Sequence, residues 1–242
     1  MGRNLDYFDH GVGEYASILV HYRPEGKIPF VTVTWAGIVN GWTLLSLKGI
    51  VVSNNTAFGA RKESLEGIST CFLLRYVAER AGSLDEGIAL VRQAKRACGT
   101  NMLIAAGRPP GGAILEFDSE RVMVRRPTRG FVGAANSFLS LYDKDVEGEV
   151  FHGGRLGCVQ NLVDGRRGRL GLSDNLAGAE GVPITTMNLH SAMIDATNLR
   201  ITVAMGRIPA YRLPYRAFRL TERRLVAEEE VDSADGKAAE GE

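Results

Sequence analysis

Segments with the pattern of β-strands occur in blocks along the chain, and helical segments separate the blocks. In the first block, residues 15–22 are rich in β-forming side chains, and residues 30–35 alternate valine and tryptophan with threonine. A turn containing proline and glycine joins these two segments, so they are predicted to form a hairpin. A second pair of strands is predicted at residues 44–47 and 49–53.

The chain then changes to helical periodicity. Residues 68–81 carry apolar side chains at helical spacing and are followed by Gly82, which suits a helix C-cap. A second predicted helix begins at Ser83 and runs to Gly99. Its first residues, SLDE, form a capping box, in which Ser83 accepts a hydrogen bond from the backbone N–H of Glu86.

More strands are predicted after this helix pair. They lie at residues 101–106, 113–117 and 121–126, and a final hairpin joins residues 190–195 to 200–205. Two short helices are predicted at residues 153–163 and 173–179. Because the strands are grouped and do not alternate regularly with helices, the sequence predicts an α+β fold of antiparallel sheets covered by helices, and it argues against a doubly wound parallel sheet.

The composition is that of one globular domain followed by a polar tail. The 242 residues are 45% hydrophobic and 24% charged, which is enough apolar material for an ordinary core. Residues 1–222 are predicted to form a single domain, and residues 223–242 an acidic disordered tail. A net charge of +1 gives no overall attraction for nucleic acid or membrane, and no apolar run approaches the ~18 to 20 residues of a membrane-spanning helix. Neither nucleic acid nor membrane is therefore expected as a partner.

The cysteines and histidines form no recognisable site. Cys71, Cys98 and Cys158 are odd in number and widely spaced, which is typical of reduced thiols in a cytosolic protein, so a cytoplasmic location is predicted. Cys71 lies in an apolar helix and is interpreted as a core residue, and the other two have no neighbouring base. The four histidines lack the close pairing of zinc ligands, so we predict no metal and no other cofactor.

The stretch GRNLDY at residues 2–7 is the first that bears on function. Arg3 and Asp6 near a terminus are by themselves most simply a solvated ion pair, worth under ~1 kcal/mol. The stretch nevertheless resembles the GRNLDY motif of the N-terminal-nucleophile (Ntn) hydrolases that cleave linear amides. These are the bile salt hydrolases, the penicillin V acylases and the acyl-CoA:6-aminopenicillanate acyltransferases, also called peptidase family C45. Further segments are similar to the acyltransferase branch in the same order, as far as about Leu220: WAG at 35–37, KGI at 48–50, VSNN at 52–55, FLLR at 72–75, SLDE at 83–86, GTNML at 99–103, GAANSF at 133–138 and HSAMID at 190–195.

This resemblance implies an αββα sandwich of two antiparallel sheets between helix layers, in agreement with the block order. It also implies that the first residue of the mature chain is a cysteine, whose own α-amino group acts as the general base. An α-amine with a pKa of ~7.7 to 8 is partly neutral at physiological pH, and a nearby guanidinium favours the thiolate. By resemblance, Arg3 stabilises this thiolate and Asp6 orients the amine.

Four further residues are assigned to the site by the same resemblance. Asn55 and Asn136 match family positions that line the acyl pocket, where a side-chain NH2 group can stabilise a tetrahedral intermediate. We assign Asn55 to the oxyanion hole and Asn136 to orientation of the amine or the substrate, while the alignment leaves open whether Asn54 replaces Asn55. Trp35 and Asn54 are assigned to substrate binding. Without the resemblance, the asparagines would be read as ordinary turn and cap residues.

The sequence departs from the family pattern in two places. No cysteine precedes Gly2, where the family has its nucleophile, and residues 45–47 read LSL where the family commonly has Met-Asn-Glu. Two hypotheses follow. The protein is an active amide hydrolase or acyltransferase whose cysteine-bearing first strand lies ahead of the printed start, or it is a catalytically inactive, truncated relic that binds a small acylated ligand or a partner. The first hypothesis predicts an open sheet edge and a deep groove beside Arg3, Asp6 and Asn136.

The predicted substrate is a small acylated amide or thioester. Its acyl group would form a thioester with the cysteine and pass to water or to an amine, and we favour hydrolysis. The sequence does not decide between a monomer and a homo-oligomer.

Overall fold

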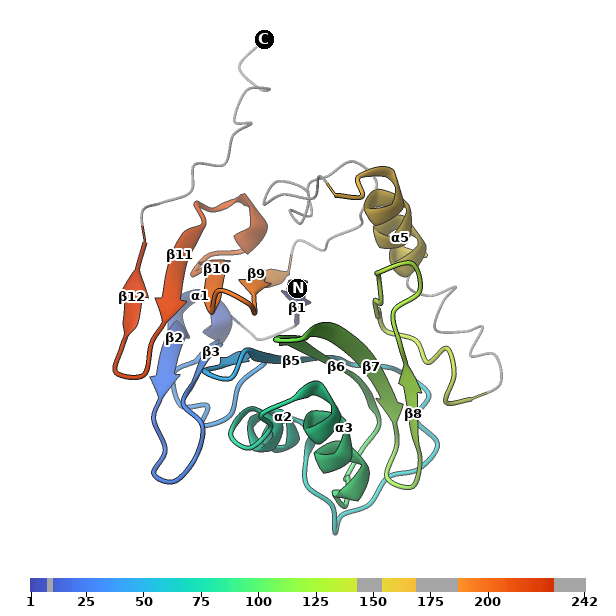
Figure 1. Ribbon diagram of the computed structural model, residues 1–242. Coiled ribbons are helices and arrows are strands. Elements are labelled where there is room, and N and C mark those ends of the chain that lie inside the picture. The colour runs from blue at the N-terminus through green and yellow to red at the C-terminus, as the bar shows by residue number, and fades with distance from the viewer. Residues whose placement is uncertain (8–10, 143–153, 169–186, 229–242) are drawn as a thin grey trace.

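The computed structural model describes residues 1–7, 11–142, 154–168 and 187–228. Two antiparallel sheets pack face to face, and a pair of helices covers the outer face of one sheet (Figure 1). The α+β class with antiparallel sheets, predicted from the grouping of the strands, is confirmed.

The larger sheet has seven strands, and their order in space is their order in the chain. They are β2 (Ser17–Tyr22), β3 (Phe30–Trp35), β4 (Thr43–Ser46), β5 (Ile50–Asn55), β6 (Thr100–Gly107), β7 (Pro110–Phe117) and β8 (Val122–Arg125). Each strand pairs with the next, and the helix pair is inserted between β5 and β6. The predicted hairpins of this sheet are confirmed, with Tyr22 opposite Phe30 at the first turn.

The smaller sheet joins the first residues of the chain to the last part of the fold. Its strands lie in the order β1 (Gly2–Asp6), β9 (Asn188–Asp195), β10 (Arg200–Met205), β11 (Arg216–Leu220) and β12 (Leu225–Ala227). The predicted hairpin of β9 and β10 is confirmed. In the described part of the chain, β1 pairs with β9 alone, so β1 is an edge strand.

The helices α2 (Thr70–Ala78) and α3 (Leu84–Gln93) bury their apolar stripes on the larger sheet. Leu73 and Val77 of α2 and Val91 of α3 are fully buried in this layer. The predicted capping box is also confirmed, because the Ser83 hydroxyl accepts from the backbone N–H of Glu86 at 3.2 Å. Each fully buried Val or Leu contributes about 1.5 to 3 kcal/mol, so this layer is a major part of the core.

A second apolar layer lies between the two sheets. It contains Val31, Val33, Leu45 and Val51 from the larger sheet and Ala192, Ile194, Ile201 and Val203 from the smaller one. Along β5, side chains alternate, so Val51 faces the other sheet and Val52 faces the helices. This alternation decides which of the asparagines at the end of β5 can reach the space between the sheets.

The second helix ends earlier than its sequence predicts, at Gln93 and not near residue 99. Arg96 explains the early end, because its guanidinium Nη1 donates to the backbone carbonyls of Val91 and Ala94 at 2.9 and 2.8 Å. These carbonyls lie at the C-terminal end of α3, where no following helical N–H groups are available to pair with them. Arg96 also forms a parallel bridge with Ile68, and an extended backbone at this position is incompatible with continued helix.

Other boundaries also differ from the predictions. Tyr15 belongs to a short helix, α1 (Val12–Ala16), and the first hairpin strand begins only at Ser17. The tail boundary at residue 223 is too early, because β12 pairs with β11 and Glu228 binds Arg200 at 2.6 Å. The helix predicted at residues 173–179 lies outside the described residues.

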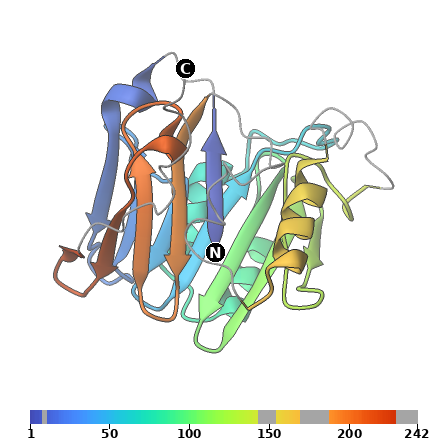
Figure 2. The ribbon, with the colours of Figure 1, turned by 90° about the horizontal axis from the view of Figure 1, so that it is seen from above.

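The helix predicted at residues 153–163 is present as α5 (Arg155–Gly165), but it does not form an outer layer. It stands beside β7 and β8 on the side of the larger sheet that also carries the smaller sheet (Figures 1 and 2). The 3-10 helix η1 (Ala210–Arg212) packs against β9 and β10. In the part of the chain that the structure describes, the one layer of long outer helices is therefore α2 and α3.

Candidate active site

A groove with a volume of about 960 Å³ opens between β1 and α5. Its lining residues belong to the smaller sheet on one side, to α5 on the other, and to β5, β6 and β7 between them. Figure 2 shows how these elements are arranged. The groove is lined by Arg3, Asp6, Asn55 and Asn136 among others. The predicted groove beside Arg3, Asp6 and Asn136 is therefore confirmed.

Arg3 lies on the face of β1 that packs toward the larger sheet, because it is opposite Ala192 in the strand pair. It is only 7% exposed, and its Nη1 donates to the backbone carbonyl of Trp42 at 2.9 Å. Burial lowers the pKa of Arg3 to about 10, and the Asp6 carboxylate acts in the opposite direction. Arg3 therefore stays charged at neutral pH, and its Nε has no hydrogen-bond partner among the described residues.

Asp6 is connected to Asn136 through Arg155. Asp6 Oδ1 accepts from the Asn188 side-chain amide at 3.2 Å, and Asp6 Oδ2 lies 3.7 Å from Nη1 of Arg155. Nη2 of Arg155 donates to Oδ1 of Asn136 at 2.7 Å. Asn136 Nδ2 in turn donates to the backbone carbonyl of Thr56 at 2.7 Å. Two of the predicted site residues are thus brought together by one guanidinium.

Of the two neighbouring asparagines of β5, only Asn55 lines the groove. Its side chain makes no hydrogen bond with the described residues, so its NH2 group is available to a ligand. Asn54 lies on the opposite face of the strand, the face that carries Val52 and the helices, where its Nδ2 is 3.5 Å from the Thr100 hydroxyl. The strand alternation therefore favours Asn55 for contact with a bound ligand and places Asn54 away from the groove.

Trp35 is also away from the groove. It is 8% exposed and packs in a small apolar cluster with Leu5 and Leu189. Its ring lies 5.7 Å from that of Trp42, which in turn stacks on Tyr7 at 6.3 Å. Trp35 therefore supports the backbone near Arg3, and the structure does not bring it to the groove.

His190 is a buried titratable group beside Arg3. It is 2% exposed, and its Nε2 lies 2.8 Å from the hydroxyl of Thr43. Burial, and then the charge of Arg3, lower the pKa of His190 well below 6.5. His190 is therefore neutral at physiological pH and adds no second positive charge next to Arg3.

The charges at this end of the groove favour an anion. The guanidinium groups of Arg3 and Arg155 face a single carboxylate, that of Asp6. Away from this end, apolar side chains line the floor and α5, with Leu103, Ala105 and Ile114 on the floor and Leu156, Val159 and Leu162 on α5, while Asp195 and Arg200 also line the groove. The arrangement suits a polar reacting group attached to an apolar one.

The cysteines of the chain lie elsewhere. Among the described residues that line the groove there is no cysteine. Burial, and then the neighbouring Cys98, raise the pKa of Cys71 to about 11, which disfavours its reactive thiolate form. The described residues also contain no cluster of side chains suited to a metal ion, and no described helix is long and apolar enough to cross a membrane.

Sequence reasoning missed Arg155 as a residue of this groove and His190 as a buried neighbour of Arg3. Arg155 is the first residue of α5 and follows Gly154, whose φ of +68° is left-handed. Nothing in the local sequence distinguishes it from the other arginines of the chain. A contact with Asp6, far away in the sequence, becomes visible only in the fold.

A comparison with models of protein families shows to which family the chain is related. Residues 1–162 match the model of the acyl-coenzyme A:6-aminopenicillanic acid acyl-transferase family. The chain belongs to this family. The match includes five residues that line the groove: Arg3, Asp6, Asn55, Asn136 and Arg155. No curated protein sequence matches the chain.

Solved structures of amide hydrolases have the same fold as this acyl-transferase family member. An N-acylethanolamine-hydrolyzing acid amidase ortholog from Caenorhabditis elegans superposes with a TM-score of 0.60 at 15% identity, covering 91% of this chain and 94% of that one. A mutant conjugated bile acid hydrolase from Clostridium perfringens gives 0.61 at 12% identity, with coverages of 97% and 95%. A penicillin V acylase from Agrobacterium tumefaciens gives 0.56 at 8% identity, with coverages of 84% and 78%. The predicted Ntn-hydrolase fold is confirmed.

Proposed function

We propose that this protein is an amide hydrolase or acyltransferase that works through a thioester on an N-terminal cysteine, and that a segment outside the printed 242 residues contributes this cysteine. The proposal rests on one observation above all. A buried, charged guanidinium, that of Arg3, lines a groove directly beside the open edge of β1. An extended segment in this groove could pair with β1 and bring a thiolate to the guanidinium.

The edge of β1, which is unpaired among the described residues, supports the first part of this proposal. An edge strand presents unpaired N–H and C=O groups, and natural proteins usually cover or pair them. Here the edge faces a groove of about 960 Å³ whose opposite wall, α5, carries Leu156 and Val159. An added strand would find backbone partners on one side and apolar partners on the other.

The placement of the cysteines supports the second part. Cys71, Cys98 and Cys158 are free but do not line the groove. Cys71 lies on α2, and this helix packs on the other face of the larger sheet. A thioester mechanism at this groove therefore requires a thiol from another segment.

The chemistry follows from the groups at the polar end of the groove. The α-amine of the cysteine takes the thiol proton, and the thiolate attacks the acyl carbonyl carbon. The positive charge of Arg3 favours the thiolate, and Asp6 holds the protonated amine. The amine then returns its proton to the leaving nitrogen as the carbon-nitrogen bond breaks and the thioester forms. Water hydrolyses this thioester, or a second amine accepts the acyl group.

The two groove asparagines act on the reacting carbonyl and amine. The side-chain NH2 group of Asn55 makes no hydrogen bond with the described residues, so we assign it as the donor to the oxyanion; losing one such donor typically costs ~10² to 10³ in rate. Asn136 is held by Thr56 and Arg155, and the second proton of its NH2 group has no acceptor among the described residues. This proton is directed to the substrate or its leaving amine.

The decisive experiment extends the protein. The in-frame codons ahead of Met1 are read, and the longer product is expressed beside the 242-residue chain. We expect a cysteine that becomes N-terminal in the mature product, turnover of a chromogenic acyl amide by that product alone, and its inactivation by iodoacetamide. The matched control replaces Cys71, Cys98 and Cys158 with alanine in the longer product and should remain active.

Two results would count against this function. Turnover by the 242-residue chain itself would refute the account of the nucleophile. A stop codon directly ahead of Met1, together with tight binding of an acylated amide without turnover, would support the alternative of a catalytically inactive relic that binds a small ligand.

A further inference from the structure

Three polar side chains form a row across the groove-facing side of the larger sheet. Asn55 on β5 lies opposite Asn101 on β6, and Asn101 lies opposite Glu116 on β7. Residues directly opposite one another on neighbouring strands point to the same face. Because Asn55 lines the groove, Asn101 and Glu116 share its face of the sheet. The segment that carries Asn136 packs over this row.

Asn101 holds the backbone on both sides of Asn136. It is 1% exposed, and its Nδ2 donates to the carbonyls of Ala135 at 3.1 Å and Ser137 at 2.8 Å. Its Oδ1 has no partner among the described residues. Burying an amide oxygen without a partner is costly. The two hydrogen bonds that the NH2 group of Asn101 donates offset this cost and explain why an asparagine lies at this position.

Glu116 holds the same segment a few residues further on. It is fully buried, and its Oε2 accepts from three consecutive backbone N–H groups, those of Leu139, Ser140 and Leu141, at 2.9, 2.6 and 3.0 Å. Its Oε1 accepts from Nε of Arg125 at 2.5 Å. A buried carboxylate is tolerated only when its charge is paired and its oxygens accept hydrogen bonds, as they do here.

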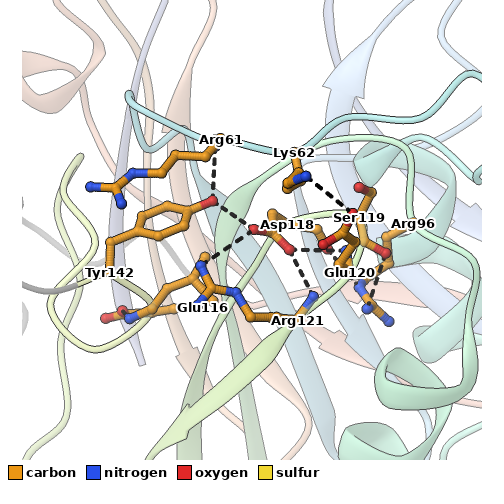
Figure 3. A network of polar contacts seen from close by, with 10 residues as sticks. Arg61, Lys62, Arg96, Glu116, Asp118, Ser119, Glu120, Arg121 and Tyr142 are labelled. Carbon is orange, nitrogen blue, oxygen red and sulfur yellow. Dashed lines mark hydrogen bonds and ion pairs between the residues drawn. The ribbon is translucent and has the colours of Figure 1, made fainter.

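Two more contacts hold the ends of the segment. Nη2 of Arg125 donates to the carbonyl of Gly133 at 2.9 Å. At the other end, the Tyr142 hydroxyl donates to Asp118 at 2.7 Å and accepts from the backbone N–H of Arg61 at 2.8 Å. Figure 3 shows the Tyr142 hydroxyl directed at Asp118, with Glu116 beside them. The segment from residue 133 to 142 is thus fixed at both ends and at its centre.

We propose that Asn101 and Glu116 are positioning residues that hold Asn136 at the groove. The residues that precede Asn136 are glycine and alanine, whose side chains are too small to anchor a loop. The sheet therefore supplies the anchors, a donor from Asn101 and an acceptor from Glu116. A preorganised amide costs no rearrangement when the substrate binds, whereas a displacement of ~1 Å can cost ~10²-fold in rate. Only the assignment of Asn136 to the reaction rests on the proposed function.

The first test measures the position of Asn136 directly in the 242-residue chain. The side-chain NH2 signals of Asn136 are assigned by NMR through their loss in Asn136→Ala, and their exchange with water is measured. Glu116→Gln, which keeps the shape but removes the charge, should speed this exchange by about tenfold or more. Glu66→Gln removes a carboxylate from an exposed ion pair with Lys95 at 3.3 Å and should leave the exchange unchanged. If Glu116→Gln leaves the Asn136 signals unchanged while the backbone N–H groups of residues 139–141 exchange faster, Glu116 has a structural role alone and the inference is wrong.

The second test uses the catalytically competent product described above. Glu116→Gln should lower kcat by ~10²-fold with little change in KM, because the groove itself is intact. In the Asn136→Ala background, Glu116→Gln should have no further effect, because its influence passes through Asn136. Additive losses in this double-mutant cycle would overturn the inference.

A milder variant keeps the inference testable if Glu116→Gln does not fold. Arg125→Lys keeps the positive charge beside Glu116 but lacks the planar guanidinium with which Arg125 donates from Nε to Glu116 and from Nη2 to the Gly133 carbonyl. It should speed the exchange of the Asn136 NH2 protons in the same direction. Loss of turnover in every form of the protein would refute the proposed function, while the exchange measurement would still decide whether Glu116 positions Asn136.

Discussion

Replacing Arg3 with methionine is expected to stabilise the 242-residue chain, although Arg3 lies at the centre of the candidate site. Burial lowers the pKa of Arg3 from its ordinary, higher value to about 10, against the opposing effect of Asp6. Because one pKa unit corresponds to about 1.4 kcal/mol, keeping this charge buried at neutral pH costs on the order of 3 kcal/mol. Methionine has a similar length and no charge to bury.

The variant also loses an interaction. The bond from Nη1 of Arg3 to the Trp42 carbonyl is 2.9 Å long, and its loss costs about 1 to 3 kcal/mol. Asp6 is not left without partners, because Asn188 and Arg155 still contact it. The balance is a gain of about 0 to 2 kcal/mol in the free energy of unfolding, which corresponds to a rise of up to about 8 °C in Tm.

Urea and thermal unfolding at pH 7 measure this change. Arg126→Met is the control, because Arg126 is 52% exposed in its ion pair with Asp85, and its replacement should change the stability by less than about 1 kcal/mol. If Arg3→Met lowers the free energy of unfolding by more than about 1 kcal/mol, the reasoning from burial is refuted. In the catalytically competent product, the same variant should lose activity while gaining stability, as expected for a charge kept for function.

Two further predictions concern stability. The pKa of His190 is held well below 6.5 by burial and by Arg3, so the unfolded state binds more protons below this pH and stability should fall on acidification, by up to about 1.4 kcal/mol per pH unit. His190→Gln should reduce this slope between pH 6.5 and 5 in urea unfolding, and an unchanged slope would contradict the assignment. Gly107→Ala should destabilise the chain by about 1 to 3 kcal/mol, because its Cβ would lie 2.4 Å from the backbone carbonyl carbon of Ala196. Gly157 lies in α5 with open space around it, so Gly157→Ala should raise the free energy of unfolding by about 0.5 to 1 kcal/mol. Equal effects of the two glycine variants in thermal unfolding would contradict the packing argument.

The local elements could be predicted because their signals are local. A Ser83 that caps its own helix, and valines that alternate along β3, depend on neighbours within a few residues. The early end of α3 could not be predicted in this way. Arg96 terminates that helix by binding the carbonyls of Val91 and Ala94 and pairing with Ile68, which lies in a different segment.

In the candidate site, too, some features could be predicted from the sequence and others depend on the fold. The GRNLDY stretch and the asparagine-bearing segments were recognisable in the sequence, and the groove beside them was predicted. The sequence could not decide between Asn54 and Asn55, because the choice depends on which face of β5 packs against the helices. Trp35 is predicted to bind substrate, yet it lies in the apolar cluster with Leu5 and Leu189.

The sequence by itself determined the antiparallel strand blocks, the Ser83 cap of α3 and the family motif, since each is written in a short run of residues. Only the tertiary structure decided that Arg155 joins Asp6 to Asn136. The same holds for Asn101 and Glu116, which hold the segment that carries Asn136. The physical reason is that these contacts join strands and helices distant in the chain. Their distances are set by how the two sheets and α5 pack, which is a property of the whole fold.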